Sequence, residues 1–173
     1  MIAIRILFLE FIIYSFLGYI LECIYSSIVD KRINFNRGFF NGPYCPIYGA
    51  TLVILQIQNY LGLDLVTSIC SAIVLIAFTE YFTAFVLECI FKRTWWDYSR
   101  KKFNIKGRVC LDNLILFGIG SVIINRTMTK EIYNFFCTNS FLLTPLFIFF
   151  LYLFFLDLFL SIRKHYAVKK TSS

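Results

Sequence analysis

The chain has 173 residues, of which 59% are hydrophobic, 20% aromatic and 16% charged, with a formal charge of +7. A soluble chain of this length would leave large apolar patches in water, and a lipid bilayer removes that difficulty. The basic residues collect near the ends of apolar runs, which indicates membrane lipid as the partner and excludes nucleic acid from the expected partners.

Five apolar runs predict an all-α bundle of membrane-spanning helices, at about 20 residues a span. They form a single expected membrane domain, 1–163, followed by a mobile basic cytoplasmic tail, 164–173. Arg5 and Glu10 interrupt the first run, which has no small-x-small cleavage site, so we expect a retained helix there. We expect a polar connection at Asn125–Ser140. The five spans are expected at 3–27, 45–60, 65–91, 109–124 and 141–162.

The distribution of Lys and Arg predicts the orientation of the chain. With five spans, one side receives three basic residues after the first span, seven within 92–108 and four in the tail. The other side receives only Arg5, Arg126 and Lys130. Cytoplasmic segments carry the excess of basic residues. We therefore predict a multi-pass protein of the cell membrane with its N-terminus outside and its C-terminus in the cytoplasm.

A short motif occurs twice, at the ends of the first and third spans. Residues 16–25 are FLGYILECIY and residues 82–91 are FTAFVLECIF, so the LECI tetrad recurs 66 residues later. Each copy precedes a basic connection that contains Phe-Asn and a Gly–Arg pair, and then another span. Because both copies cross the membrane in the same direction, the pattern predicts a parallel repeat of a helix–loop–helix unit.

Two glutamates near the cytoplasmic ends of spans are the main ionisable candidates. An ionised side chain at the bilayer centre costs roughly 2.5–3.5 kcal/mol, so such residues face the protein interior and usually have a role. Glu22 and Glu88 have basic candidates in the adjoining connections, namely Arg37, Lys106 and Arg108. We predict Glu–Arg pairs that hold the connections against the helix ends. The alternative is that both glutamates reach cytoplasmic water.

The first connection also carries dense turn signals, which predict a fixed, non-helical entry into the second span, of a kind tolerated near membrane depth only when buried in protein or lining a wet cavity. Asp97 is expected to cap a short interfacial helix or to meet Arg108. An aromatic belt with positive-inside charge explains the Trp and Lys residues, but not Asp97, Asn104 and the glycines. The loop-motif positions are Asn36, Gly38, Gly42, Pro43, Cys45, Pro46 and Gly49 in the first connection, and Trp95, Trp96, Tyr98, Ser99 and Gly107 in the second.

Polar side chains from both connections and the adjoining span ends are expected to gather on the cytoplasmic face. Sets of carboxylates with arginine suit phosphate binding and acid–base work. No residue is assigned as catalytic, because there is no Ser–His arrangement and His165 lies in the tail. The six cysteines form no CxxC pair and are expected to pack as small apolar groups, so we expect no metal and no cofactor. The expected polar cluster is Glu22, Arg37, Tyr48, Glu88, Asp97, Asn104 and Arg108.

The order of these motifs resembles the bacterial family labelled Putative ABC-transporter type IV, whose members are small multi-span proteins described as permeases. The resemblance covers most of residues 14–111, with Tyr19 where the family commonly has Trp, and it implies a transport role. Residues 125–173 carry no part of it. The matching stretches are YSFLGYILE (14–22), NRGFFNGPYCPIYG (36–49), LE (87–88), WWDYS (95–99) and FNIKGRVCL (103–111).

Three functions remain open. The first is an ABC transporter permease-like subunit, which needs a separate ATPase because the chain has no GxxxxGK[ST] loop, and a homo-oligomer because five spans enclose no wide path alone. The second is an interfacial membrane enzyme acting on a lipid headgroup or lipid-linked substrate. The lack of an activated nucleophile argues against it. The third is a structural or regulatory membrane subunit.

Overall fold

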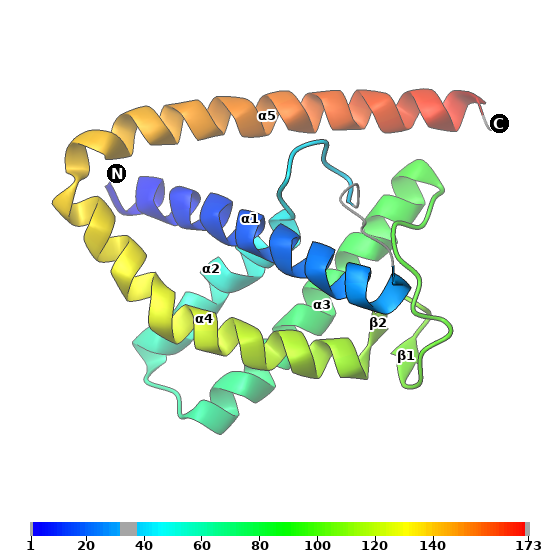
Figure 1. The fold of residues 1–173 in the computed structure, drawn as a ribbon, viewed down its shortest axis with the longest axis horizontal. Helices are drawn as coiled ribbons and strands as arrows, with labels where there is room; N and C mark the ends of the chain where they lie inside the picture. The colour runs from blue at the N-terminus through cyan, green and yellow to red at the C-terminus, as the bar shows by residue number, and fades with distance from the viewer. Residues whose placement is uncertain (1, 32–37, 172–173) are drawn as a thin grey trace. The chain divides into compact units, whose positions relative to one another are not determined.

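The computed structural model describes residues 2–31 and 38–171 and is mainly helical (Figure 1). Between the third and fourth helices, strand β1 (Asn104–Ile105) pairs antiparallel with strand β2 (Val109–Cys110). The predicted all-α fold is confirmed. The five helices of the described part are α1 (Ile2–Asp30), α2 (Pro46–Leu61), α3 (Leu65–Phe91), α4 (Leu111–Thr138) and α5 (Ser140–Thr171).

Three of the described helices are long and apolar enough to cross a membrane, judged by length and composition. They are Ile2–Ile28 of α1, Leu65–Phe91 of α3 and Ser140–Ala167 of α5. Helix α2 has 16 residues, a length of about 24 Å, which is shorter than the hydrocarbon core of about 30 Å. The chain therefore has the helices of a membrane protein, and the number of five spans stays a prediction.

Local signals set the ends of α2 and α3. Pro46 begins α2, where its missing N–H leaves no hydrogen bond unmade. Asp64 caps α3, since its Oδ2 accepts the N–H groups of Val66 and Thr67 at 3.0 and 3.2 Å. Hydrogen bonds from the Thr67 side chain and backbone lower the pKa of the Asp64 carboxyl. Helix α3 ends where Lys92 adopts a left-handed conformation with a φ of 57°.

Helices α4 and α5 extend beyond their predicted ends. Residues up to Thr138 are helical, so the expected polar connection at Asn125–Ser140 is wrong over nearly all of its length. Asn125 satisfies its amide inside the fold by donating from Nδ2 to the Leu52 carbonyl at 3.0 Å, which removes the need for a solvated loop. Helix α5 runs to Thr171, so most of the tail expected to be mobile is helical.

The described residues divide into two compact units. Unit 1 is Met1–Ala50 with Asn134–Ser173, and unit 2 is Thr51–Tyr133. Each unit has its own packing and its own group of bonded polar side chains. The single membrane domain expected from the sequence stays a prediction.

In unit 1, aromatic rings join α1 to α5. Phe8 meets Phe147 edge-on with centroids 5.4 Å apart, and Phe11 meets Phe154 edge-on at 5.6 Å. Such ring pairs add about 0.5–1.5 kcal/mol beyond the burial of their area. The loop before α2 reaches α5 as well (Figure 1), so α5 contacts two separate segments of unit 1.

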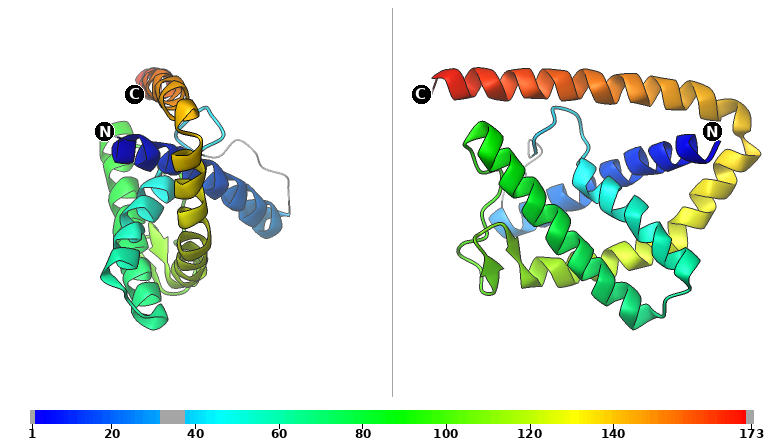
Figure 2. Two further views of the ribbon diagram at one scale, coloured as in Figure 1. Left: turned by 90° about the vertical axis from the view of Figure 1, so that its left-hand side faces the viewer. Right: turned by 180° about the vertical axis from the view of Figure 1, so that it is seen from behind.

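In unit 2, the start of α4 packs on α3. Ile76, Val109 and Leu114 form a buried cluster, with Tyr81 and Phe117 packed around it. The hairpin β1–β2 lies at the end of the unit where α3 ends and α4 begins (Figure 2). Hydrophobic burial of this kind contributes roughly 25 cal/mol for each Å² of apolar surface removed from solvent.

Candidate functional site

A cluster around Arg108 joins the hairpin to α3 in unit 2. The Arg108 Nη2 and Nε atoms donate to Glu88 Oε2 at 2.7 and 3.0 Å, and Nη1 donates to the Tyr81 hydroxyl at 2.8 Å. The guanidinium also lies over the rings of Tyr81 and Phe85, 5.0 and 5.3 Å from their centroids. The two acceptors, Tyr81 and Glu88, lie about two helical turns apart and are therefore on the same face of α3. The bond to Glu88 raises the pKa of Arg108, which stays charged.

Asn104 organises the turn of the hairpin from inside. Its Nδ2 donates to the carbonyls of Ser99 and Lys101 at 3.3 and 2.7 Å. Its Oδ1 accepts the Gly107 N–H at 2.9 Å. One amide side chain therefore bonds to backbone groups on both sides of the turn. Asparagine suits this position because its short side chain can bond to nearby backbone groups.

Asp97 and Trp96 hold the outer part of the same loop. Asp97 Oδ1 accepts the Ser99 N–H at 2.8 Å and Oδ2 accepts the Ser99 hydroxyl at 3.0 Å. These bonds lower the pKa of the Asp97 carboxyl. Trp96 Nε1 donates to the Arg108 carbonyl at 2.8 Å. Gly107 has a φ of +69°, and a Cβ there would lie 2.7 Å from Asp97 Oδ1, so glycine is required for conformation and for space.

A second cluster, around Asp157 of α5, holds the loop before α2 in unit 1. Asp157 Oδ2 accepts the Gly42 N–H at 2.9 Å and the Tyr44 hydroxyl at 2.6 Å. Its Oδ1 accepts the Asn41 Nδ2 group at 3.0 Å. Burial and the bond to Asp157 raise the pKa of the Tyr44 phenol, which keeps its proton. Ser161 lies one turn further along α5 and accepts from Asn41 Nδ2 at 2.8 Å.

The end of α5 adds two contacts to this Asp157 cluster. Lys164 Nζ donates to Asn41 Oδ1 at 2.9 Å, and His165 Nε2 lies 2.9 Å from the Phe39 carbonyl oxygen. The His165 ring also packs on the Phe39 ring, with centroids 5.0 Å apart. The residues expected to form a mobile tail therefore bind the first connection.

Glu22 has a phenol as its partner in unit 1. Tyr48 Oη donates to Glu22 Oε2 at 2.8 Å. The residues before Tyr48 are held by a backbone hydrogen bond, in which the Cys45 N–H donates to the Ser15 carbonyl at 2.9 Å. Gly49 lies directly against Ser15 and Phe11, where a Cβ would collide with the Ser15 hydroxyl and the Phe11 carbonyl oxygen. The face of α1 that carries Ser15 and Glu22 thus receives the start of α2.

A family model described as Putative ABC-transporter type IV matches residues 9–162. The chain belongs to this family. No curated protein and no solved structure matches the chain. The family match includes both the Arg108 and the Asp157 clusters, apart from Lys164 and His165. The resemblance drawn from the motifs is confirmed, and the match extends it into α5.

The structure divides the predicted polar cluster between the two units. Glu22 and Tyr48 meet in unit 1, whereas Glu88 meets Arg108 in unit 2. Asn36 and Arg37 lie outside the described residues, so the predicted Glu22–Arg37 pair stays a prediction. The Glu88–Arg108 pair forms as predicted. Asp97 does neither of the two things expected of it, because the Ser99 N–H and hydroxyl occupy its carboxylate and Arg108 binds Glu88 instead.

The remaining loop-motif residues have local roles. Pro46 starts α2, Gly38 has a φ of +128° and Pro43 is exposed. Trp95 packs edge-on to Phe91 at 5.6 Å. The Tyr98 N–H donates to the Gly107 carbonyl at 2.7 Å, which closes the loop below the hairpin.

The Asp157 cluster is the part that sequence reasoning missed. Asp157 is the sole acidic residue in the apolar run 141–162, and Ser161 follows it by four residues, on the same helical face. An ionisable residue in such a run demands a partner, and that signal was present. What was missing was the identity of the partner, because Asn41 and Tyr44 lie more than a hundred positions earlier.

Metal chemistry has no candidate in the described part of the chain. No three His, Cys, Asp or Glu side chains among these residues lie close enough together to hold a metal ion. Cys23 and Cys110 are buried, as expected for thiols that pack as small apolar groups, whereas Cys70, Cys89 and Cys137 are exposed, so the expectation is wrong for these three.

Proposed function

We propose that this chain is a permease-like membrane subunit of an ABC transporter and works with a separate ATPase subunit. The family match and the three long apolar helices support a membrane component of such a system. The sequence has no GxxxxGK[ST] motif, so ATP binding of the P-loop kind has to come from another chain. A homodimer or larger assembly belongs to the proposal, because so few spans enclose no wide path alone.

The network of hydrogen bonds in the loop between α3 and α4 is the observation that carries this proposal. Residues 92–108 are ordered by the internal bonds of Asn104 and Asp97 and are pinned to α3 by Arg108. Lys92, Arg93 and Thr94 are exposed next to the end of α3. A rigid loop lets a soluble subunit that docks there displace α3 and α4 together, whereas a flexible linker would absorb the displacement.

The bonding of the polar side chains favours this function over an interfacial enzyme. Glu88 is engaged by Arg108, and Asp97 by Ser99. Carboxylates that accept such bonds in the resting protein serve as structural acceptors, and acid–base catalysis needs a carboxylate directed at a substrate. A structural or regulatory subunit would use the same bonds, and it differs from the proposal in having no ATPase partner.

The test is purification of the tagged chain from its native membranes in a mild detergent, followed by mass spectrometry of the intact complex. We expect a P-loop ATPase at fixed stoichiometry. Arg108→Gln should release it by loosening the loop, while the chain stays folded by circular dichroism. A homo-oligomer that carries no ATPase would overturn the proposal and favour the structural subunit.

The matched control for this experiment is Arg126→Gln. Arg126 also makes hydrogen bonds within unit 2, from Nη2 to the Leu63 carbonyl and the Ser68 hydroxyl at 2.8 and 2.9 Å. It lies in α4, well away from the hairpin in sequence. The Arg126→Gln variant should therefore keep the ATPase, and equal loss in both variants would show that the ATPase does not depend on the loop.

A further inference from the structure

The tip of the hairpin, residues Arg100–Lys106, exposes two large apolar side chains. Phe103 is 76% exposed and Ile105 is 56% exposed. Asn104 lies between them and directs its amide into the loop, where it bonds to the Lys101 carbonyl. The exposed fractions show that Phe103 and Ile105 both lie on the outside of the loop, whereas Asn104 between them faces inward.

The backbone of the tip is fixed in this arrangement. Phe103 and Lys106 have φ angles of +53° and +52°, which non-glycine residues rarely adopt. The Leu111 N–H donates to the Phe103 carbonyl at 3.2 Å, and Asn104 is paired with Cys110 across the hairpin. Such strained positions persist where the surrounding structure imposes them, and they are concentrated at functional sites.

Basic side chains surround the two apolar ones. Arg100, Lys102 and Lys106 are exposed, whereas Lys101 donates from Nζ to the side-chain Oδ1 of Asn113 at 2.8 Å. The segment from Arg100 to Arg108 contains no acidic residue. The tip therefore presents an apolar pair within a positively charged rim, which is complementary to a surface that is negative outside and apolar beneath.

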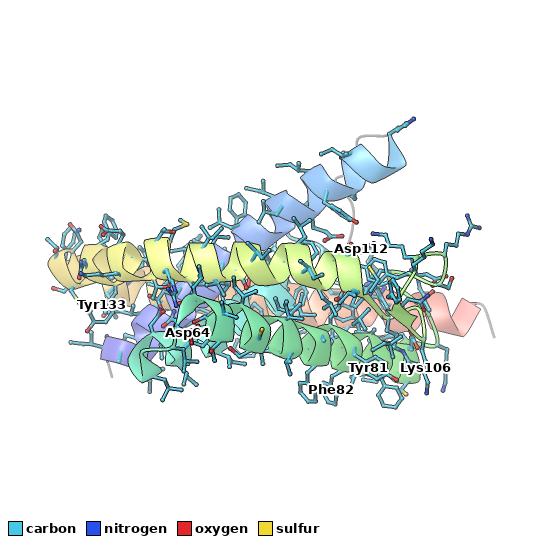
Figure 3. All side chains as sticks on the ribbon, turned by 90° about the horizontal axis from the view of Figure 1, so that it is seen from below. Asp64, Tyr81, Phe82, Lys106, Asp112 and Tyr133 are labelled. Atoms are coloured by element: carbon cyan, nitrogen blue, oxygen red, sulfur yellow. The ribbon has the colours of Figure 1, made fainter. Side chains whose placement is uncertain are left out.

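The position of the tip matches such a surface. Helix α3 has 27 residues, a length of about 40 Å, and the hydrocarbon core is about 30 Å thick, so its ends reach the headgroup region. Figure 3 places Lys106 toward the end of unit 2 opposite Asp64, the residue that caps the start of α3. The hairpin thus lies at headgroup level beside the end of a membrane helix.

We propose that the hairpin tip binds the anionic phospholipid surface of the membrane in which the chain lies. Phe103 and Ile105 insert between the headgroups, and Arg100, Lys102 and Lys106 contact lipid phosphates. This contact anchors the second loop in the plane of the membrane. It is independent of the ATPase proposal, because the tip is separate from the exposed Lys92–Thr94 segment.

Photo-crosslinking of the full chain identifies what covers the tip. Phe103→benzoylphenylalanine protein is placed in nanodiscs of equal parts phosphatidylglycerol and phosphatidylcholine and irradiated. Mass spectrometry should show lipid adducts with phosphatidylglycerol enriched at least about fivefold over phosphatidylcholine, the factor expected from a single basic residue near an anionic surface. Phe78→benzoylphenylalanine is the control, because Phe78 is 66% exposed on α3 with no basic residue nearby in the sequence. It should crosslink both lipids equally.

A second variant separates charge from apolar insertion. Lys102→Gln with Lys106→Gln, added to the Phe103 crosslinker, should remove most of the phosphatidylglycerol preference while lipid adducts persist. Both lysines are exposed, so the melting temperature should not change. The proposal is overturned if Phe103 crosslinks to an ATPase or a second copy in native membranes, if no lipid adduct forms, or if its lipid ratio equals that at Phe78.

Discussion

The loop before α2 (residues 38–45, the first loop) and the loop before α4 (residues 92–110, the second loop) follow similar LECI motifs but are stabilised in different ways. The second loop satisfies its polar groups locally, through Asn104 and Asp97 and through Arg108 on the adjacent helix. The first loop depends on Asp157, which lies more than a hundred residues later. Sequence neighbours thus stabilise one loop, and a distant helix stabilises the other.

The helices that flank the two loops nevertheless pack in an equivalent way. Gly49 contacts Phe11 and Ser15 of α1. Leu114 belongs to the core that includes Tyr81, and Tyr81 lies 66 positions after Ser15, the same spacing that separates the LECI tetrads. Both α2 and α4 thus begin against the helix that precedes their loop. The helix–loop–helix repeat stays a prediction.

The comparison teaches that each second helix begins against the preceding helix in both units, whereas the loops between them are held by different contacts. Glu22 accepts from the neutral hydroxyl of Tyr48, whereas Glu88 accepts from the charged Arg108. Arg108 makes two hydrogen bonds to Glu88 and brings a full positive charge to it, whereas Glu22 receives one hydrogen bond from an uncharged donor. The second loop is therefore expected to be the more rigid of the two at its helix contact.

The largest effect is expected from Asp157→Ala, which should release the first loop alone. The Gly42 N–H, the Asn41 amide and the Tyr44 hydroxyl would lose a charged acceptor. We expect unfolding free energy to fall by about 3 kcal/mol. Thermal denaturation in detergent measures the loss, and hydrogen exchange should quicken in the first loop but not at 98–107.

Asp112→Ala serves as its control. Asp112 is an exposed acidic residue in the first turn of α4, where its interaction with the helix dipole contributes about 0.5 kcal/mol. Equal losses in the two variants, or faster exchange in the second loop of the Asp157 variant, would remove the contrast between the loops.

Gly49→Ala should disturb the packing of the start of α2 against α1, because the added methyl group overfills the contact. The added Cβ would meet the Ser15 hydroxyl and the Phe11 carbonyl oxygen, and a backbone atom does not move aside easily. We expect a loss of about 2 kcal/mol in a denaturant titration. At Gly120 nothing lies within 4 Å of the corresponding Cβ, so Gly120→Ala should stabilise α4 by about 1 kcal/mol. A neutral Gly49→Ala would mean that the two helices do not pack this closely.

Glu88→Gln should cost more than Glu22→Gln. The first change replaces a charged acceptor of Arg108, and we expect a loss of about 1.5 kcal/mol. The second leaves an amide oxygen that still accepts from Tyr48, with a loss of about 0.5 kcal/mol. Parallel thermal melts of the two variants decide the point. A larger loss from Glu22→Gln than from Glu88→Gln would contradict this ranking of the two contacts.

The smallest effect concerns the pH dependence of the second loop. Bonds from Ser99 hold the pKa of Asp97 below the ordinary value. The stability contributed by this turn is therefore fully present above the ordinary carboxyl pKa and is lost as the pH falls through the lowered one. Both tryptophans of the chain lie in this loop, so their emission should shift as the pH falls. Asp97→Asn should abolish that response, and an unchanged titration would count against the turn.

Sequence reasoning predicted the second loop better than the first for a physical reason. Glu88, Asn104 and Arg108 lie within about twenty residues of one another, and their spacing limits which pairs form. Gly107 was singled out as a turn residue, and it has the left-handed conformation that glycine permits. Contacts between residues that lie close together in the sequence can therefore be predicted from their spacing.

The first loop and the helix ends were less predictable because their partners lie far along the chain. Nothing near Asn41 or Tyr44 indicates that Asp157 will bind them. The same is true of Asn125, whose polarity suggested a loop until the Leu52 carbonyl supplied a partner within the helix packing. Polarity alone did not distinguish a solvated residue from one bonded inside the fold.

The central claim places both loops on the cytoplasmic side of the membrane, where a separate ATPase subunit could reach them, and cysteine labelling tests that placement most directly. The half-buried Cys45 and the exposed Cys70, Cys89 and Cys137 are replaced by serine, which leaves only the buried Cys23 and Cys110. One exposed cysteine is then placed at Pro43 or at Thr94, or is restored at 137. A membrane-impermeant maleimide is applied to intact cells and to permeabilised cells. The account predicts that positions 43 and 94 react only after permeabilisation, and that Cys137 reacts in intact cells. Labelling of position 94 from outside, or of positions 43 and 94 from opposite sides, would contradict it.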